Sequence, residues 1–350
     1  MEIKEIRLRN FRNHHNLQLK FSTGLNIIIG PNGSGKSNIV EAIVLLATTK
    51  SYRTTEITNL IEDGQEFTFV EGDVSDKKLK IVISAKGRQC YCDRSTIRLS
   101  SDFIGLFQAI VFSPKDLLFV SDPPKVRRRF IDSELSKINR NYLRKLSEYN
   151  IRIKNRNAIL KSENVNIALL DVLDETLAEL MVDIAAWRKE YLSEINKKFT
   201  DKLNLLVSEP AKAEISCQTV CEGLNKEDIQ RQLQNQRTRD ILSKKTNFGT
   251  HRDDYLIRFN GHEAESYCSQ GYTRLIMLAL KLVLADICYE LTGEKPVILL
   301  DDVLSELDLI HQKKLLSLLP KEQQTIITAT HLDDVLAEAN KNIIELTRRN

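Results

Sequence analysis

Gly30-Pro31-Asn32-Gly33-Ser34-Gly35-Lys36-Ser37 fits the phosphate-binding loop pattern G-x-x-x-x-G-K-[ST]. Its glycines allow successive backbone N–H groups to turn toward a phosphate, at the start of a helix whose N-terminal dipole favours anions. An apolar run at residues 27–29 precedes the loop, and residues 38–47 have the pattern of a helix. We therefore expect Lys36 to reach the β- and γ-phosphates of a nucleotide and the Ser37 hydroxyl to ligate Mg²⁺.

A second stretch, Val297-Ile298-Leu299-Leu300-Asp301-Asp302, has the composition of a buried strand that ends in two carboxylates. A carboxylate at this position can reach Mg²⁺, so Asp301 is the expected metal-side residue together with Ser37. The next carboxylate, Asp302, can orient the water that attacks the γ-phosphate. Combined with the phosphate loop, this strand predicts a site that binds and hydrolyses ATP.

The chain around these motifs has the pattern of an α/β protein. Polar and apolar residues alternate, as in half-buried antiparallel strands, at residues 3–8, 17–21 and 68–97. Short apolar runs, typical of the buried strands of a parallel sheet, occur at residues 27–29, 109–112, 297–300, 325–328 and 342–346. A further strand at 255–259 is followed by an Asn260-Gly261 hairpin turn and by a helix from about Ser269.

Between these strands, apolar residues recur every three or four positions, which predicts two long helices. The first covers residues 125–160, and the second covers 169–206 after a polar break. Each would extend about 50 Å, and the short connection makes them an antiparallel pair. We therefore expect residues 123–245 to form an inserted helical arm (lobe II), and residues 1–122 and 246–350 to form the head.

Charge is balanced over the 350 residues, since 51 Lys and Arg stand against 48 Asp and Glu. Residues 125–161, however, carry a local net charge of +9. Such clustering is the electrostatic footprint of DNA-backbone binding, whereas a solvated helix face is the alternative interpretation. The candidate DNA-binding residues are Arg127, Arg128, Arg129, Arg140 and Arg144.

Nothing in the sequence indicates secretion or a membrane. The N-terminal residues lack the apolar segment of a signal peptide, and the longest apolar stretch, 275–288, is broken by Lys281 and Asp286. We expect a cytoplasmic protein with reduced thiols and no membrane partner. A split zinc site at Cys90/Cys92 and Cys217/Cys221 is an alternative, although neither pair has the spacing of common zinc sites.

Three further motifs resemble those of the ABC ATPases. Val303-Leu304-Ser305-Glu306-Leu307-Asp308 is similar to the D-loop of that family, Cys268-Ser269-Gln270-Gly271 to its signature motif, and His331 to its switch histidine. The resemblance implies that Ser269 and Gly271 cap the γ-phosphate held by the phosphate loop of another subunit. Because the chain has one phosphate loop, it implies an ATP-dependent homodimer or a separate partner.

Within this class the sequence resembles the RecF family from end to end. Its opening, Leu8-Arg9-Asn10-Phe11-Arg12-Asn13, is similar to the start of that family, which implies that Arg12 and Asn13 lie near the nucleotide. Asn38, which follows the phosphate loop, is a further candidate for nucleotide binding. Further similar blocks are Ser51-Tyr52-Arg53-Thr54, Phe112-Ser113-Pro114-Lys115-Asp116-Leu117, Arg127-Arg128-Arg129-Phe130-Ile131-Asp132 and His251-Arg252-Asp253-Asp254. The sequence departs from the family at Tyr272 and Thr273, which replace the usual glutamines, and at Thr250, which replaces a proline.

The resemblance implies an ABC-type P-loop ATPase head with an antiparallel β subdomain and an inserted antiparallel two-helix arm. It also implies a weak, DNA-stimulated ATPase of recombinational repair and replication-fork maintenance, with a link to the SOS response. Such a protein would dimerise with ATP and Mg²⁺ on duplex DNA near single-strand gaps. It would promote RecA loading together with RecR and RecO.

Other classes of protein fit the sequence less well. Asp102-Phe103-Ile104-Gly105 and Asn225-Lys226-Glu227-Asp228 mimic two GTPase motifs, but neither follows a buried strand. The ATPase subunit of a membrane ABC transporter is the main alternative, and it predicts a compact helical lobe without a local basic excess. A nuclease-linked break-repair ATPase would require a catalytic partner.

Overall fold

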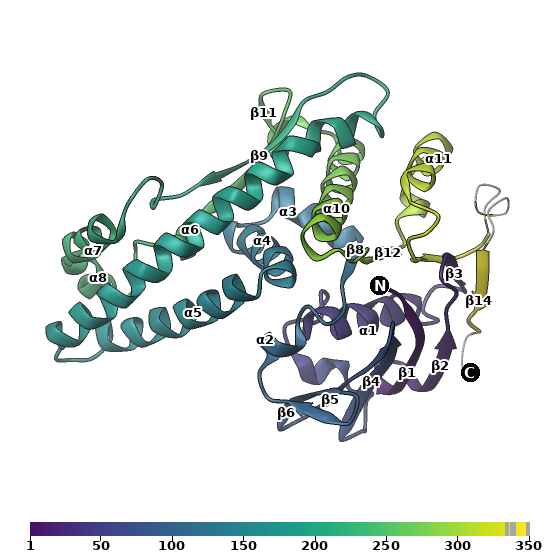
Figure 1. Ribbon diagram of the computed structural model, residues 1–350, viewed down its shortest axis with the longest axis horizontal. Helices are drawn as coiled ribbons and strands as arrows, with labels where there is room; N and C mark the ends of the chain where they lie inside the picture. The colour runs from purple at the N-terminus through teal and green to yellow at the C-terminus, as the bar shows by residue number, and fades with distance from the viewer. Residues whose placement is uncertain (333–335, 337–340, 348–350) are drawn as a thin grey trace. The chain divides into compact units, whose positions relative to one another are not determined.

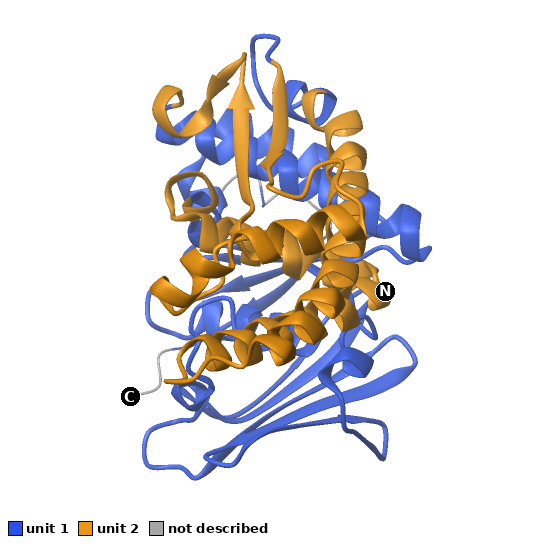
Figure 2. Cartoon of the chain, turned by 90° about the vertical axis from the view of Figure 1, so that its left-hand side faces the viewer, with its two compact units in different colours: residues 1–117, 201–211, 269–350 blue, residues 118–200, 212–268 orange. Residues whose placement is uncertain are grey.

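The computed structural model describes residues 1–332, 336 and 341–347, and the chain divides into two compact units (Figure 2). Unit 1 comprises residues 1–117, 201–211 and 269–350, and unit 2 comprises residues 118–200 and 212–268. Three stretches fall in the other unit than the one we expected. Residues 201–211 belong to unit 1, whereas residues 118–122 and 246–268 belong to unit 2. The division of the chain into a head domain and an arm domain stays a prediction.

A five-stranded parallel sheet forms one layer of unit 1. Its order is β14 (Lys341–Glu345), β3 (Leu25–Ile29), β13 (Thr325–Ala329), β12 (Val297–Asp301) and β8 (Ala109–Phe112). The central strands are Ile-, Val- and Leu-rich and are buried along most of their length, as strands covered on both faces must be. The apolar runs of the sequence therefore form the parallel sheet that they predicted.

A six-stranded sheet forms the second layer of unit 1. Its order is β2 (His14–Lys20), β1 (Ile3–Phe11), β4 (Phe67–Val74), β5 (Lys77–Ser84), β6 (Gly87–Cys92) and β7 (Ser95–Ile97), with antiparallel pairing throughout. Burial alternates along β4 and β5, so one face of this sheet lies on the core. This sheet is the expected antiparallel β subdomain.

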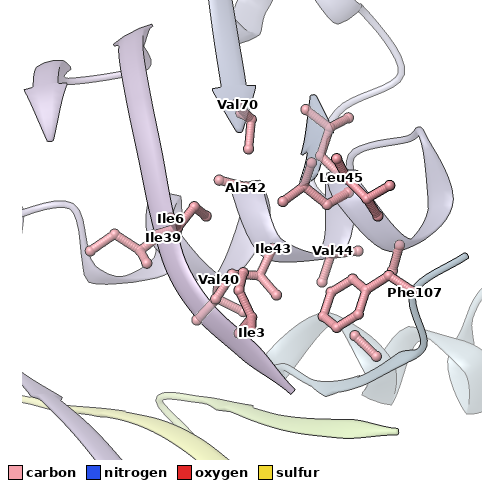
Figure 3. Close-up of a cluster of buried hydrophobic side chains, with 14 of the residues drawn as sticks. Ile3, Ile6, Ile39, Val40, Ala42, Ile43, Val44, Leu45, Val70 and Phe107 are labelled. Carbon is pink, nitrogen blue, oxygen red and sulfur yellow. The ribbon is translucent and has the colours of Figure 1, made fainter. Parts of the chain in front are cut away.

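Helix α1 (Lys36–Thr48) packs against both sheets of unit 1 (Figure 1). Ten of its thirteen residues are buried, which is the pattern of a helix covered on all sides. Ile39, Ile43 and Val44 on α1 and Ile3 and Val70 on the antiparallel sheet lie in one hydrophobic cluster (Figure 3). The helix that begins at the phosphate loop is thus fixed by the main core of the unit.

The remaining elements of unit 1 flank these layers. They are η1 (Ile57–Leu60), α2 (Ser100–Phe103), η2 (Pro114–Leu117), α10 (Gln270–Thr292), η4 (Leu304–Glu306) and α11 (Leu309–Leu318). Among the described residues, none of the helices is both long enough and apolar enough to span a bilayer.

Unit 2 is mainly helical. It contains α3 (Leu118–Ser121), α4 (Pro124–Ile138), α5 (Arg140–Leu160), α7 (Lys226–Asn235), α8 (Arg237–Ser243), η3 (Thr250–Arg252), α9 (Ala264–Tyr267) and most of α6 (Ile167–Asn204). It also contains a three-stranded sheet of β9 (Ala213–Gln218), β10 (Asp254–Phe259) and β11 (His262–Glu263). Asn260 and Gly261 both have positive φ, at 49° and 84°, as the expected hairpin turn between β10 and β11 requires.

The first arm helix is not continuous, contrary to our expectation. Asn139 adopts an extended conformation between α4 and α5, and its side chain accepts a hydrogen bond from the Tyr142 N–H at 2.8 Å. Asparagine is a favoured helix N-cap because its side-chain oxygen satisfies a terminal N–H group. The apolar periodicity of the sequence continues through this break, so periodicity alone could not predict that the helix is interrupted at Asn139.

Helices α5 and α6 are antiparallel, as expected. The Tyr142 hydroxyl accepts from Arg188 Nε at 3.0 Å, Lys145 pairs with Asp183, and Arg156 pairs with Asp174 at 2.7 Å. Residue numbers therefore rise along α5 as they fall along α6.

Two buried arginines tie unit 2 together. Arg156 is fully buried and donates to Asp174 at 2.7 Å, to Asp240 at 2.6 Å and to Thr246 at 3.1 Å. Arg188 donates to Asp253 at 2.6 Å and to Asp132 at 2.7 Å. Each guanidinium thus joins segments that are distant in sequence.

Arg156→Ala should destabilise unit 2 by about 3–5 kcal/mol, because it leaves the buried Asp240 carboxylate without its cation. The matched control is Arg152→Ala on the same helix, whose partner Glu148 is half exposed. That change should cost about 1 kcal/mol or less. Urea unfolding followed by circular dichroism measures both variants, and equal costs would refute a structural role for the Arg156 cluster.

Candidate functional site

The phosphate loop connects β3 to α1 in the geometry that the sequence predicted. Gly35 precedes the first residue of α1 with a φ of 97°, and Gly33 has a φ of 83°. These left-handed conformations favour glycine. In the part of the chain that the structure describes, no side chain caps the N-terminus of α1. Its terminal N–H groups can therefore serve an anion.

Close packing also requires glycine in this loop. A Cβ atom at Gly30 would lie 2.6 Å from the Leu346 carbonyl oxygen, and one at Gly35 would lie 2.6 Å from Asn13 Oδ1. The Ser34 hydroxyl is buried without a hydrogen-bond partner among the described residues. A buried polar group of this kind is costly unless it serves a ligand or water.

Lys36 folds back onto its own loop. Its Nζ donates to the Gly30 carbonyl at 2.6 Å and to the Pro31 carbonyl at 3.1 Å. Burial lowers the pKa of Lys36, and the nearby carboxylates of Asp302 and Asp301 oppose this by raising it. The lysine of the phosphate loop and the two acids of β12 therefore share one electrostatic environment.

The two acids occupy the carboxyl end of β12. Asp301 is 4% exposed, and its Oδ2 and Oδ1 accept from the Tyr52 hydroxyl at 2.7 Å and from the Thr328 hydroxyl at 3.1 Å. Asp302 has a φ of 56°, its N–H donates to the Thr328 hydroxyl at 2.9 Å, and its Oδ1 accepts from Ser305 Oγ at 3.2 Å. Both carboxylates are thus held in fixed positions.

The residues present suit Mg²⁺ bound with a nucleotide. The Ser37 hydroxyl and the Asp301 carboxylate are oxygen ligands of the kind that Mg²⁺ prefers. Among the described residues, no group of three or more His, Cys, Asp or Glu could hold a metal by itself. Mg²⁺ is usually held by one or two carboxylates together with substrate phosphates, so an incomplete protein site is the arrangement to expect.

The predicted nucleotide-binding residues outside the loop lie beside it. Asn13 Oδ1 accepts from Asn38 Nδ2 at 2.8 Å, and Asn13 Nδ2 donates to the Gly33 carbonyl at 3.4 Å. Arg12 makes a bidentate pair with Glu41, with distances of 3.0 and 2.8 Å. In this structure, therefore, Arg12 neutralises a fully buried carboxylate of α1.

We did not predict a role for four residues around this site. Glu41 is bound by Ser51 and Arg53 as well as by Arg12, and Arg53 also donates to Asn38 at 2.5 Å. Tyr52 holds Asp301. Three of the four lie in the block Ser51-Tyr52-Arg53-Thr54. The similarity of that block to the RecF family was the one sequence signal that could have indicated their role. Their partners in α1 and β12 could not be deduced from spacing.

The signature residues lie on an exposed helix end. Ser269 caps α10 by accepting from the Tyr272 N–H at 3.3 Å, and space is open around Gly271, where a Cβ would meet nothing closer than 3.9 Å. Within the described ranges, no hydrogen bond joins Ser269 or Gly271 to the phosphate loop. His331 is exposed after β13 and hydrogen bonds with the Thr330 hydroxyl at 2.8 Å.

The candidate DNA-binding arginines differ in exposure. Arg127 is a correction to our expectation, because its side chain is only 7% exposed and its guanidinium makes a bidentate pair with Asp254 at 2.7 and 2.8 Å. Arg128 donates to the Asp253 carbonyl at 2.5 Å. Arg129, Arg140 and Arg144 are exposed. The blocks at 127–132 and 251–254 therefore bind each other within unit 2.

Among the described residues, the cysteines are not part of any group of three or more His, Cys, Asp or Glu that could hold a metal. Cys90 and Cys92 belong to unit 1, whereas Cys217 and Cys221 belong to unit 2. Burial raises the pKa of Cys217 and of Cys221 to about 12, which disfavours the thiolate that a metal requires.

Comparison with known proteins identifies the family. The family model described as the RecF/RecN/SMC N terminal domain matches residues 2–350. The chain is 36% identical to the DNA replication and repair protein RecF of Clostridium perfringens, covering 98% of this chain and 96% of the relative. It is 38% identical to RecF of Streptococcus uberis, covering 96% and 95%.

Solved structures agree with these matches. A structure of the recombination mediator protein RecF with ATP, in the RecFOR pathway, superposes with a TM-score of 0.88 at 34% identity, covering 95% of this chain and 92% of that one. An Smc head domain from Pyrococcus furiosus has a TM-score of 0.54 at 18% identity, covering 96% and 90%, and shows the fold alone. These similarities confirm the expected ATPase-head fold. The chain belongs to the RecF family of DNA replication and repair proteins.

Proposed function

We propose that this chain binds ATP with Mg²⁺ and hydrolyses it slowly, as a switch for assembly on DNA. The observation that carries this proposal is geometric: the phosphate loop with the buried Lys36 follows β3, and Asp301 and Asp302 stand at the carboxyl end of β12 in the same parallel sheet. A phosphate loop and two acids at the same edge of one parallel sheet are the arrangement that P-loop ATPases use. The RecF relative solved with ATP supports the same choice of nucleotide.

Each residue of the site has a proposed role in this reaction. The N–H groups at residues 33–37 receive the phosphates, while Lys36 exchanges the Gly30 and Pro31 carbonyls for phosphate oxygens. Ser37 and Asp301 would hold Mg²⁺, which supplies charge neutralisation for the transferred phosphoryl group. Asp302 orients the attacking water, and His331 contacts the γ-phosphate. Arg12, Asn13 and Asn38 line the nucleotide site.

We further propose that ATP joins two copies of the chain. Ser269 and Gly271 stand at the exposed N-terminus of the 23-residue helix α10, where backbone N–H groups and the helix dipole favour an anion. Next to the D-loop, Leu309 and Ile310 on α11 are 60% and 64% exposed. Large exposed apolar side chains next to the D-loop suit a surface that a second copy covers.

DNA is the proposed partner of the exposed cations of unit 2. Arg140, Arg144 and Lys154 are exposed and project from one face of α5, since their spacing returns to the same side of a helix. Arg129 on α4 is exposed as well. Backbone phosphates are the partners that such a row of cations selects, without base contacts. Arg127 is left out of this surface because of its burial.

The family names suggest the biological setting. RecF relatives are DNA replication and repair proteins, and the solved RecF is a recombination mediator of the RecFOR pathway. We therefore propose action on duplex DNA near single-strand gaps, with RecR and RecO as partners and RecA loading as the outcome. Because it would act on chromosomal DNA, we also propose that the chain works in the cytoplasm. The transporter-subunit alternative predicted a compact helical lobe, and the long antiparallel pair of α5 and α6 does not favour it.

Lys36→Arg should abolish ATP-dependent dimerisation, because the larger guanidinium cannot occupy the space of the ammonium between the loop and the phosphates. Asp302→Asn is the matched variant, and it should still dimerise with ATP while losing turnover, because it removes only the water-orienting carboxylate. Sedimentation velocity with ATP and Mg²⁺ measures both variants. Wild-type-like dimerisation of Lys36→Arg would contradict the proposal.

Reversing the charge at Arg140 and Arg144, each to Glu, should weaken DNA binding uniformly across sequences. The slope of log K against log salt should become shallower by about 2, since each lost phosphate contact contributes about 0.9. Arg231→Glu with Arg239→Glu is the control, because both residues are exposed in unit 2 and the change in net charge is equal. Equal effects of the two double variants, in fluorescence anisotropy titrations over a salt series, would remove the α5 surface from the proposal.

A further inference from the structure

In unit 1, the side chain of Arg274 joins the signature helix to the D-loop. Its Nη2 pairs with Glu306 Oε2 at 2.6 Å, and its Nη1 donates to the Glu306 carbonyl at 2.9 Å. Arg274 stands five residues after Ser269, in the second turn of α10. One guanidinium thus binds both the side chain and the backbone of the D-loop.

The D-loop is in turn attached to the catalytic carboxylate. Ser305 Oγ donates to the Asp302 carbonyl at 3.0 Å and to Asp302 Oδ1 at 3.2 Å. From the other side, Gln312 Nε2 donates to the carbonyls of Leu304 and Leu307 at 2.9 and 3.1 Å. The contacts therefore run without interruption from Asp302 through Ser305 and Glu306 to Arg274 and α10.

The pair lies beside an apolar pocket. Phe112, Met277, Leu278 and Val303 line this pocket together with Arg274 and Glu306, and its free volume is about 20 Å³. That space admits about one water molecule. Charges beside an apolar wall are screened less than charges on an open surface, so the Arg274–Glu306 pair is stronger than its partial exposure alone would suggest.

We infer that Arg274 is a positioning residue that makes the signature helix end and the D-loop move as one piece. This inference rests on the proposed ATP-dependent dimer. Asp302 responds to the nucleotide bound in its own chain, whereas Ser269 and Gly271 meet the nucleotide of the second copy. Arg274 couples the position of Asp302 to the position of Ser269 and Gly271. Its loss leaves ATP binding by one chain intact and weakens the joining of two chains.

A surface ion pair with only a local structural effect is the competing explanation. It predicts small changes in thermal stability and no specific loss of dimerisation. A positioning role predicts that dimer affinity falls while nucleotide affinity does not. It also predicts that exchanging the charges of Arg274 and Glu306 restores dimer affinity. The two explanations therefore differ in a measurable way.

The test compares Arg274→Glu, Glu306→Arg and the double exchange, in the full-length chain. Fluorescence titration with a labelled ATP analogue, at protein concentrations below dimerisation, measures nucleotide affinity. Sedimentation velocity with ATP measures dimer affinity. Each single reversal should leave nucleotide affinity within about twofold of the wild-type value. It should lower dimer affinity by roughly tenfold or more, as expected for coupled sites. The double exchange should regain most of the lost dimer affinity.

The control is Lys295→Glu with Glu322→Lys, an exposed pair of unit 1 at 3.2 Å, which should change neither constant. Arg274→Gln replaces the reversal if Arg274→Glu does not fold. Wild-type dimerisation in the single reversals, or a double exchange as weak as the singles, would overturn the inference while the proposed function stands. A wild-type chain that stays monomeric with ATP would overturn the proposed function itself.

Discussion

The candidate nucleotide site depends on one electrostatic arrangement, a buried ammonium group that shares the edge of a parallel sheet with two carboxylates. Strand β13 separates β3 from β12, so the carboxyl ends of all three strands meet at this edge. Burial lowers the pKa of Lys36, and Asp302 and Asp301 raise it. A triphosphate bound here would add several negative charges, and Mg²⁺ is the group that would offset them. The core around α1 and the bonds of Tyr52 and Thr328 to Asp301 keep these charges in place.

The two RecF-like blocks at 127–132 and 251–254 show that a family motif can be structural. Arg127 binds Asp254, and Arg188 links Asp132 to Asp253. Together these contacts close unit 2 across more than a hundred residues of sequence. The similarity of the two blocks to the RecF family is therefore explained by their pairing with each other. The exposed arginines of α5 remain the better candidates for DNA binding.

Much of the fold and the nucleotide site could be predicted from local patterns. The loop from Gly30 to Ser37, the two acids at the carboxyl end of β12 and the start of α10 near Ser269 depend on short-range geometry, so local patterns predict where they stand in the fold. Three features escaped prediction because they depend on distant contacts. Asn139 interrupts a helix whose apolar period continues, Arg127 is buried by a strand that follows it by more than a hundred residues, and Tyr52 reaches Asp301 only in the folded chain.

The central claim is that each nucleotide lies between the phosphate loop of one copy and the Ser269 helix of another. Mixing two inactive variants tests it directly. Lys36→Arg lacks a working phosphate loop, and Ser269→Arg lacks a working signature-helix end. A mixed dimer contains one intact site, formed by the phosphate loop of the Ser269→Arg copy and the Ser269 helix end of the Lys36→Arg copy. The account predicts that ATP turnover, absent in either variant alone, returns when the two are mixed. Turnover that stays absent in the mixture, with both variants folded, would contradict it.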